Sequence, residues 1–434
     1  MSANNEPLRQ ALESLLDLPQ TRVEEAFEDR NGHIQVKLVS TQVGTTCHRC
    51  GKWATQPNGS SEWLTVRHLD LLGKPVYLRF RLPRYRCDCD DGPTSTQQVS
   101  WYNRRSRFTK AYEAHLLLAC VNATLSDVAQ KEAVSTDDLQ GLLDRTIERR
   151  APWARLTSLE VIGIDEIALK KGHRDFVAIV TGQSGDQTHI LGVLKDRQKA
   201  TVIHFLSSMP KRLRQTVQVL CSDLYDGFIN AAKAVFGRRI RVVADRFHVA
   251  KLYREAVDNL RKNEMKRLRK TLPKATYRQL KGAMWALRNP PETLTDEEAN
   301  VLALLFTHSP RLREAVDLRD ELTALFDEPL TRKQAKLRLS GWAARVKRSS
   351  VRCFDGFLRT LNLHQEEISN YFPERYNSGF VEGLNNKIKV IKRRCYGLLN
   401  RDHLFQRLYL DLFGYALYGR RNNGLAPTPL GSMA

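Results

Sequence analysis

The stretch Leu159-Glu-Val-Ile-Gly-Ile-Asp165-Glu166 decides the fold, because an apolar strand here ends in two acidic residues. Two more apolar runs follow at 176–182 and 188–194, and both read as strands. The links between these strands are too short for crossover helices, so the sequence predicts an antiparallel meander. Asp165 is therefore expected at the end of the first strand of a sheet.

Two further strands extend the predicted sheet. The run 216–222 ends at Asp223, and after an intervening helix the run 240–244 ends at Asp245. Antiparallel strands followed by alternating helix and strand is the order of the α/β RNase H-like fold. That fold sets strand one beside strand four, so Asp165 and Asp223 are expected on neighbouring strand ends about 5 Å apart. This gap suits carboxylates that share Mg²⁺ ions, and Asp245, one strand further out, is the second choice.

A third acidic residue comes from a helix much later in the chain. The stretch 377–389 places Glu382 between Gly379 and Gly383, where the backbone can be approached closely. Its cations are expected to bind DNA: Lys387, Lys389, Lys392, Arg393 and Arg394. A metal-binding acid beside phosphate-binding cations is what phosphoryl transfer on DNA requires. Each acid taken singly reads as a surface residue or a helix cap, and the hypothesis rests on their combination.

Two tight cysteine pairs predict a structural metal site. Cys47-His-Arg-Cys50-Gly51 has the spacing of a zinc knuckle, and Cys87-Asp-Cys89 supplies two further thiolates. Four thiolates would close a tetrahedral Zn²⁺ site and leave no open position for a catalytic water. The alternative is two pairs of free thiols.

A helix-turn-helix is predicted after the cysteines. The segment 125–139 reads as a helix, a tight turn and a second helix that Ser135 or Thr136 caps. Such a second helix can enter a major groove of DNA. Asp137 and Asp138 in its first turn would repel phosphates, however, so DNA contact through this helix is left open.

The composition is typical of a protein that binds nucleic acid. The 434 residues include 69 lysines and arginines against 48 acids, a formal charge of +21. An excess this large favours a polyanionic partner over a basic protein without one. No apolar run is long enough to cross a membrane, and the N-terminus lacks the pattern of a secretion signal, so a cytoplasmic location is expected.

Four segments together resemble the bacterial insertion-sequence transposases of the ISL type. They are Ile164-Asp165-Glu166, Ser222-Asp223-Leu-Tyr-Asp226-Gly227, Asp245-Arg-Phe-His248 and Glu382-Gly383-Leu-Asn-Asn-Lys-Ile-Lys389. With the cysteines and the helix-turn-helix, the resemblance spans about residues 40 to 415. It implies a DDE catalytic triad, which maps onto Asp165, Asp223 and Glu382.

Wider relatives of that family, including mutator-like transposases, carry a D-x-x-H element that Asp245 and His248 fit. The resemblance implies that His248 positions DNA or a carboxylate, and the alternative is a packed histidine at a strand end.

The segment 251–365 is helical by pattern and strongly basic at its start. Residues 251–288 hold 12 lysines and arginines against 3 acids, with Tyr253, Tyr277 and Trp285 interleaved. This density favours a surface that follows DNA phosphates over a solvated helix face. The segment resembles the insertions of mutator-like and hAT-like transposases, which implies that it holds transposon ends and supports dimer contacts.

The predicted organisation has five parts. They are an N-terminal helix (within 1–30) and zinc ribbon at 1–100, a helix-turn-helix domain at 101–155, the first part of the RNase H-like core at 156–250, an all-helical insertion at 251–365, and a catalytic helix with closing helices at 366–434.

These features predict a DNA transposase that binds terminal inverted repeats, cleaves at the element's ends and joins them to target DNA by two-metal phosphoryl transfer. Expected cofactors are two Mg²⁺ ions per active site, with Mn²⁺ as a substitute, and structural Zn²⁺. The expected partners are double-stranded DNA and a second copy of the chain, because both ends must be cut together. In a bacterium the protein is expected to be nucleoid-associated when bound to DNA.

Two rival functions follow from the same residues. A transposase-derived DNA-binding regulator would be expected to have lost an acid, and all three are present. A structure-specific nuclease on the same fold would not need a separate end-reading domain.

Overall fold

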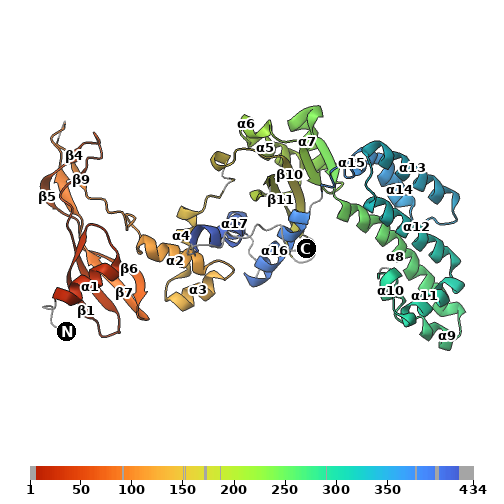
Figure 1. Cartoon of the computed structure of the whole chain (residues 1–434), viewed down its shortest axis with the longest axis horizontal. Coiled ribbons are helices and arrows are strands. Elements are labelled where there is room, and N and C mark those ends of the chain that lie inside the picture. The colour runs from red at the N-terminus through yellow and green to blue at the C-terminus, as the bar shows by residue number, and fades with distance from the viewer. Residues whose placement is uncertain are drawn as a thin grey trace. The chain divides into compact units, whose positions relative to one another are not determined.

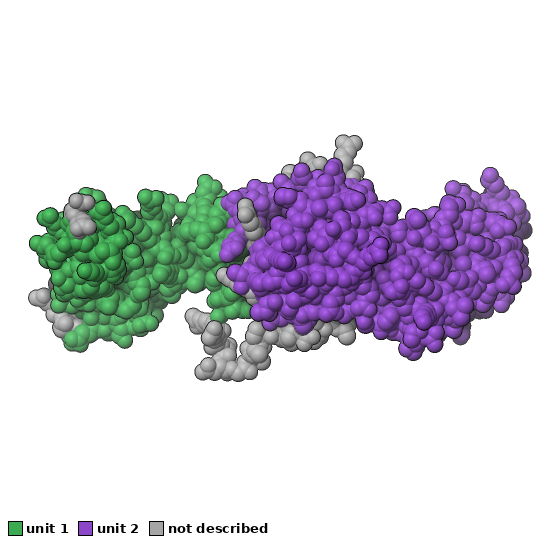
Figure 2. Space-filling view, turned by 90° about the horizontal axis from the view of Figure 1, so that it is seen from above, with its two compact units in different colours: residues 1–147, 409–425 green, residues 148–408, 426–434 purple. Residues whose placement is uncertain are grey.

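The computed structural model describes residues 6–89, 92–149, 151, 153–170, 174–185, 187–289, 291–376, 379–395 and 400–419. These residues form two compact units (Figure 2). Unit 1 comprises the described residues up to Ile147 and from Tyr409 onward, and unit 2 those from Glu148 to Leu408. None of the helices in these ranges is both long and apolar enough to cross a membrane.

A four-stranded sheet opens unit 1 (Figure 1), with strands in the order β1-β2-β7-β6. Its elements are α1 (Glu6–Leu16), β1 (Thr21–Glu28), β2 (Ile34–Ser40), β6 (Leu64–Leu71) and β7 (Lys74–Phe80). Strands β2 and β7 are parallel, and the other neighbours are antiparallel. Val36, Val76 and Leu78 alternate with polar residues along these strands and form the fully buried side of the sheet.

The short helix predicted within residues 1–30 is α1, and it does not extend through the whole of that segment. It ends at Leu16, and 21–28 form β1 instead. The reason is a tertiary one, since Val23 pairs with Leu38 on β2 and both side chains are buried.

The two cysteine pairs lie in a small ribbon of short strands. These are β3 (Thr45–Thr46), β4 (Trp53–Ala54), β5 (Gln56–Ser60), β8 (Pro83–Arg86) and β9 (Thr94–Thr96). Gly51 closes the turn after Cys50 with φ of 74°, a left-handed conformation that favours glycine, and its amide donates to the Cys47 carbonyl at 3.0 Å. The predicted turn around the first thiolate pair is therefore present.

The predicted helix-turn-helix is confirmed in unit 1. It comprises α2 (Lys110–Ala119), α3 (Leu125–Glu132) and α4 (Thr136–Thr146). Ser135 is the cap of α4, because its Oγ accepts a hydrogen bond from the Asp138 amide at 3.0 Å. Leu116 and Leu139 lie in the shared core, which Leu410 of the closing helix α17 (Arg401–Tyr418) completes.

Unit 2 contains a five-stranded sheet, of which Figure 1 labels β10 and β11, with its strands in the order β12-β11-β10-β13-β14. The strands are β10 (Val161–Lys170), β11 (Arg174–Ser184), β12 (Gln187–Leu194), β13 (Val219–Ser222) and β14 (Arg241–Ala244). The first three form the predicted antiparallel meander, and β13 and β14 run parallel to β10. The connections hold α5 (Lys199–Ser208), α6 (Lys211–Arg214) and α7 (Asp226–Phe236), with 3-10 turns η1 (Trp153–Arg155) and η2 (Gly237–Arg239).

The prediction that Asp165 ends its strand is wrong. Strand β10 continues past Asp165 to Lys170, because its pairing with β11 runs to that residue. Pairing with β13 on the other side stops at Ile164. At Asp165, β10 is therefore still paired with β11 on one side but is no longer paired with β13 on the other.

The remainder of unit 2 is helical, including the segment 251–365. Its helices are α8 (Arg246–Thr271), α9 (Lys274–Gln279), α10 (Ala283–Ala286), α11 (Asp296–His308), α12 (Pro310–Asp327), α13 (Arg332–Arg348), α14 (Asp355–Leu363), α15 (Gln365–Ser369) and α16 (Gly379–Arg394), with a 3-10 turn η3 (Pro291–Thr293). Helix α8 starts directly after β14, and one apolar core joins Val243 of that strand to Tyr253 and Trp342 of the helices. This continuity fixes the first turn of α8 against the sheet.

Candidate active site and metal centres

Three aspartates follow the same row of the central sheet. The last paired row of the parallel strands consists of Ile164, Ser222 and Ala244. Asp165 is the next residue of β10, and Asp223 and Asp245 directly follow the ends of β13 and β14. Because neighbouring strands lie about 4.8 Å apart, Asp223 stands next to Asp165, with Asp245 on its far side.

Asp223 is strongly affected by its surroundings. Burial raises the pKa of its carboxyl, and the charges of Asp165 and Glu166 raise the pKa further. The amide of Tyr225, which donates to Asp223 Oδ1 at 3.1 Å, and the ring of His248 lower this pKa. The two neighbouring carboxylates thus concentrate negative charge that a divalent cation would stabilise.

Asp245 and His248 are linked at the start of α8. Asp245 is buried, and its Oδ1 caps the helix by accepting from the Phe247 amide at 2.9 Å. His248 Nε2 lies 3.8 Å from Asp245 Oδ2 and 3.9 Å from Asp165 Oδ1. His248 therefore lies in the first turn of α8, shortly after the end of β14, and faces two carboxylates.

Arg197 is a residue of this region that the sequence reading missed. It lies between β12 and α5, and its Nη1 donates to Glu166 Oε2 at 2.8 Å. Its guanidinium carbon lies 5.0 Å from the ring centre of Tyr225 and 5.6 Å from that of Phe176. A half-exposed cation therefore contacts the residue after Asp165. Its loop position carries no sequence pattern, and only the folded chain brings it here.

The predicted third acid, Glu382, lies in the first turns of α16. This helix contacts β10, the strand that carries Asp165. The Glu382 side chain is outside the described part of the chain, as are residues 377–378 at the start of the predicted stretch. The backbone brings the helix of Glu382 to the strand of Asp165.

Helix α16 has an apolar face and a basic face. Ile388 and Ile391 are fully buried. The predicted DNA-binding cations with described side chains are exposed (Lys389, Arg393) or partly buried (Lys387, Arg394). The side chain of Lys392 lies outside the described residues. The exposed cations occupy the same helix as Glu382.

The four predicted zinc ligands come together in unit 1. The Sγ atoms of Cys47, Cys50, Cys87 and Cys89 all lie within 4.8 Å of one another. Cys47 Sγ is 3.9 Å from Cys89 Sγ, and Cys50 Sγ is 3.6 Å from Cys87 Sγ. Zn–S bonds of about 2.3 Å at tetrahedral angles require sulfur atoms about 3.8 Å apart, so this cluster fits a structural zinc ion.

The acidity of these thiols supports the same conclusion. The backbone amides of Cys50 and Arg49 lower the pKa of Cys47 to about 6, so one thiolate forms at neutral pH. Burial and the neighbouring thiols raise the pKa of Cys89 to about 12. Further ionisation therefore requires a cation that neutralises the accumulating charge.

The helix-turn-helix presents little positive charge. Asp137 is exposed on α4, and Asp138 forms an ion pair with Arg107, with Nη1 and Oδ2 3.1 Å apart. Arg145, in the last turn of α4, is paired with a buried glutamate. Residues 97–147 contain six lysines and arginines and six acids. The net charge of this domain is therefore zero.

The net positive charge of the protein lies in its C-terminal two-thirds. Residues 1–147 have 18 basic and 18 acidic residues, whereas 148–434 have 51 and 30. Around the end of α8, six exposed cations have no carboxylate partner among the described residues: Lys266, Arg269, Lys270, Lys274, Arg278 and Lys281. This basic surface fits a polyanion.

The aromatic residues of this segment do not all belong to that surface, contrary to the prediction. Tyr253 is buried, packs against Phe326 and hydrogen-bonds Thr323 at 3.1 Å, so it fills the helical core. Tyr277 is partly buried against the same core. Trp285 is 61% exposed and lies 5.4 Å below the guanidinium of its neighbour Arg288. Of the three, only Trp285 is exposed.

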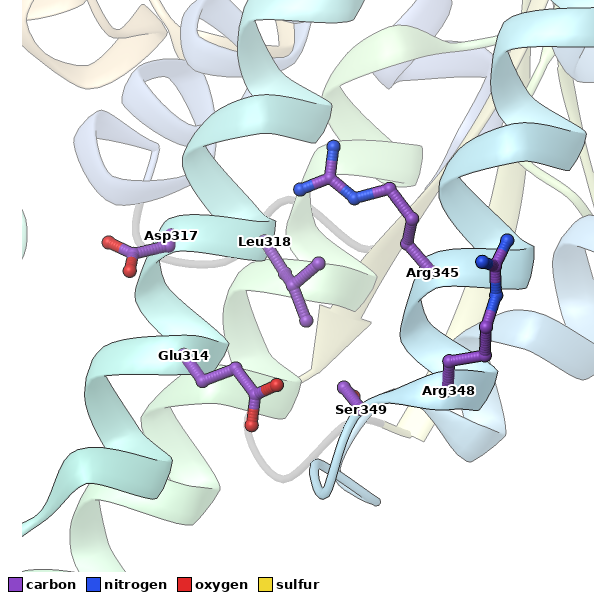
Figure 3. A pocket seen from close by; sticks show the side chains of 6 residues that line it. All are labelled: Glu314, Asp317, Leu318, Arg345, Arg348 and Ser349. Atoms are coloured by element: carbon purple, nitrogen blue, oxygen red, sulfur yellow. The ribbon is translucent and has the colours of Figure 1, made fainter.

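A cleft of about 380 Å³ separates α12 from α13 (Figure 3). Its lining is Glu314, Asp317, Leu318, Arg345, Arg348 and Ser349. The lining carries two acids on α12 and two arginines on α13, and Arg345 is already paired with Glu321 at 2.6 Å. This balance of charge does not match a polyanion, so the cleft is not part of the proposed DNA path.

Three family descriptions match the chain in order. Residues 44–89 match the zinc finger of transposases of the IS204/IS1001/IS1096/IS1165 group, and residues 97–147 the helix-turn-helix domain of transposase family ISL3. Residues 162–408, more than half of the chain, match the DDE transposase domain of ISL3. The first two matches coincide with the cysteine cluster and with α2, α3 and α4.

Known transposases are similar over most of their length. The transposase of insertion sequence IS1001 from Bordetella parapertussis is 27% identical over 394 residues, which cover 88% of this chain and 92% of that protein. The transposase of IS1557 from Mycobacterium tuberculosis is 26% identical over 404 residues, which cover 87% and 88%. The resemblance read from the motifs is thereby confirmed. With its zinc ribbon, helix-turn-helix and DDE domain in this order, the chain belongs to the ISL3 family of transposases.

Proposed function

We propose that this transposase cleaves DNA at the ends of an insertion sequence and joins the resulting 3′ ends to target DNA. The observation that carries the proposal is the placement of Asp165 and Asp223 on neighbouring parallel strands, with the helix of Glu382 against β10. Both strands and this helix fall within the matched DDE domain.

The sheet is proposed to be of the RNase H-like class. Its strand order, with an antiparallel meander on one side of β10 and parallel strands on the other, supports this assignment. The proposed organisation remains the zinc ribbon at 1–100, the helix-turn-helix at 101–155, and a catalytic core at 156–250 and 366–434 that a helical insertion at 251–365 divides.

Asp165, Asp223 and Glu382 are the proposed ligands of two Mg²⁺ ions, because carboxylate oxygens are the ligands these ions prefer. When bound, such ions would activate the attacking oxygen and stabilise the leaving oxygen of an in-line displacement. The position of Asp223 beside Asp165 supports its choice over Asp245, which follows the next strand outward in the sheet. His248, near both Asp165 and Asp245, is proposed to orient the Asp165 carboxylate.

DNA is proposed to run along the basic side of unit 2. The cations of α16 would hold phosphates near the cleaved bond, and the basic surface at the end of α8 would hold phosphates further along the duplex. The zinc ribbon and the helix-turn-helix are proposed to read the terminal inverted repeats. A homodimer is proposed because two ends must be cut together.

Cleavage of inverted-repeat DNA in the presence of Mg²⁺ tests the proposal. The wild type is expected to nick each end, Asp223→Ala to be inactive, and Asp245→Ala to keep activity in proportion to its folded fraction. Activity of Asp223→Ala with loss in a folded Asp245→Ala would overturn the ligand assignment. Specific binding by the wild type without any cleavage would instead identify a DNA-binding regulator.

A further inference from the structure

Three cations surround one exposed tryptophan, Trp63, on the four-stranded sheet of unit 1. Lys37 Nζ lies 5.4 Å from the ring centre of Trp63, and the guanidinium carbons of Arg79 and Arg81 lie 5.2 and 5.1 Å from it. These four residues, hereafter the Trp63 cluster, come from three separate segments of the chain. Cation–π attraction holds the basic groups around one ring.

The register of the strands explains how the cluster forms. Lys37 on β2 pairs with Arg79 on β7, and Arg79 pairs with Thr65 on β6. Trp63 directly precedes β6 and Arg81 directly follows β7, so both continue the same face of the sheet. The opposite face is the buried one. The cluster therefore lies on the outer face of the sheet.

The arginines of the cluster are exposed and are not neutralised. Trp63 is 40% exposed, and Arg79 and Arg81 are exposed with no carboxylate partner among the residues that the structure describes. Lys37 differs, because its Nζ lies 2.9 Å from a carboxylate oxygen of Glu24. From 74 to 86 the chain carries five cations and no acid. The cluster is thus a concentrated positive patch in a unit whose sequence to residue 147 has no net charge.

The contents of the patch indicate which part of a nucleic acid it fits. Nucleobases bind proteins by stacking on free aromatic faces. Three cations already lie 5.1 to 5.4 Å from the centre of the Trp63 ring and compete with a base for it, and the two arginines among them present guanidinium N–H donors. Guanidinium groups bind phosphate oxygens through paired hydrogen bonds, and a guanidinium fixed by an aromatic ring loses less freedom on binding.

We infer that the Trp63 cluster binds the phosphate backbone of duplex DNA next to the base sequence that the helix-turn-helix domain recognises. This inference rests on the proposed function and deepens it. The helix-turn-helix has zero net charge and an acidic start to α4, so it supplies few phosphate contacts of its own. The cluster provides such contacts independently of sequence, which positions the domain and leaves specificity to other residues.

Binding of the full-length protein to labelled duplexes over a series of salt concentrations tests the inference. One duplex carries the element's inverted repeat, and the other is a scrambled duplex of equal length. Arg79→Ala and Arg81→Ala should each weaken binding to both duplexes to a similar extent. Each should also reduce the slope of log affinity against log salt concentration, the salt slope, by about 1. Trp63→Leu should also weaken binding to both duplexes, because it releases the arginines from their fixed positions.

Arg30→Ala is the matched control, since Arg30 is an exposed cation in the turn between β1 and β2, outside the cluster. It should leave affinity and salt slope unchanged, and zinc content verifies that each variant is folded. Wild-type slopes in both arginine variants, or weakening of the inverted-repeat duplex alone, would overturn the inference. So would unchanged DNA binding with a changed oligomeric state, which would make the cluster a protein interface.

The proposed function fails separately, if the wild type shows no preference for the inverted repeat. The scrambled duplex still tests the Trp63 cluster in that case.

Discussion

At the scale of single residues, the carboxyl of Asp223 is partly buried beside two other acids, which raises its pKa. The sign of the resulting pH dependence follows from linkage. A carboxyl with a raised pKa in the folded state favours folding while it is protonated, and that contribution is lost as the pH rises from the ordinary aspartate value of about 3.9 through the raised value. Without metal, the ionised Asp223 therefore destabilises the folded chain at neutral pH.

Asp223→Asn is expected to raise the melting temperature of the metal-free protein at pH 7.5, because the amide removes the buried charge and keeps an oxygen for the Tyr225 amide. The gain should shrink toward acidic pH and vanish below about pH 4. The same variant should lose roughly a thousand-fold in Mg²⁺-dependent cleavage, the scale of several kcal/mol of lost transition-state stabilisation. Melting curves over a pH series and a cleavage assay measure both effects.

Asp226→Asn serves as the control, because Asp226 is an exposed residue at the start of α7. It should show no stabilisation that grows with pH. A lower melting temperature of Asp223→Asn at pH 7.5 would contradict the account of its burial.

Arg197 is expected to act as a positioning residue through Glu166. Arg197→Ala should lower cleavage about 10-fold, the lower end of the range seen when the partners of metal ligands are removed, because Glu166 is the neighbour of a proposed ligand and not a ligand itself. It should also raise the Mg²⁺ concentration needed for half-maximal activity, and Arg197→Lys should restore part of the loss. An unchanged Mg²⁺ requirement would show that Arg197 serves the fold alone.

At the scale of elements, the zinc ribbon depends on its four thiols. Cys47→Ser is expected to reduce bound zinc from about one ion per chain to well below one and to lower the stability of the N-terminal unit. Structural zinc contributes on the order of 10 kcal/mol to the folding of small zinc domains. Metal analysis by mass spectrometry, with thermal unfolding, measures the change. Cys353→Ser, a substitution at a partly buried cysteine of unit 2, should retain full zinc content.

Several elements were predictable because their residues are neighbours in sequence. The helix-turn-helix was predictable from a capping serine between two segments of helical apolar periodicity. The meander was predictable from three apolar runs joined by short links. The extent of β10 was not predictable in this way. Asp165 and Glu166 interrupt the apolar pattern, so the sequence suggests that the strand ends there. In the structure the strand continues to Lys170, because its backbone remains paired with β11.

Residues that act through distant partners were missed for the same reason. Arg197 meets Glu166 and Tyr225 only after the sheet has formed. Lys37 and Arg79 meet at Trp63 only because β2 pairs with β7. Conversely, the basic neighbours of Tyr253 in the sequence predicted that it belongs to a basic surface. In the structure it is buried, because it packs against Phe326, which is distant in the sequence.

At the scale of the whole molecule, residues 148–434 hold the entire net charge, and we therefore expect them to supply most of the DNA-binding energy. A basic half and a neutral half suit different tasks. The basic half would supply sequence-independent affinity, and the neutral half can discriminate between sequences without holding every duplex tightly.

The triple variant Lys266→Ala, Arg269→Ala, Lys270→Ala tests this division. It should reduce the salt slope of DNA binding by about 2 to 3, because each lost phosphate contact contributes about 0.9. The preference for the inverted repeat over a scrambled duplex should remain. The control removes three exposed cations of α13, Lys333, Lys347 and Arg348, and should change the slope little. A loss of sequence preference in the first variant would place end recognition in unit 2.

The central claim is that Asp165, Asp223 and Glu382 hold one metal centre, and localised backbone cleavage by bound Fe²⁺ tests it most directly. Iron in place of Mg²⁺, with ascorbate and peroxide, cuts the chain next to the bound ion, and the fragments are sized by mass spectrometry. The account predicts cuts near residues 165, 223 and 382 together, which Mg²⁺ competes away and Asp223→Asn abolishes. Cuts near residue 245 in place of 223, or none near 382, would contradict it.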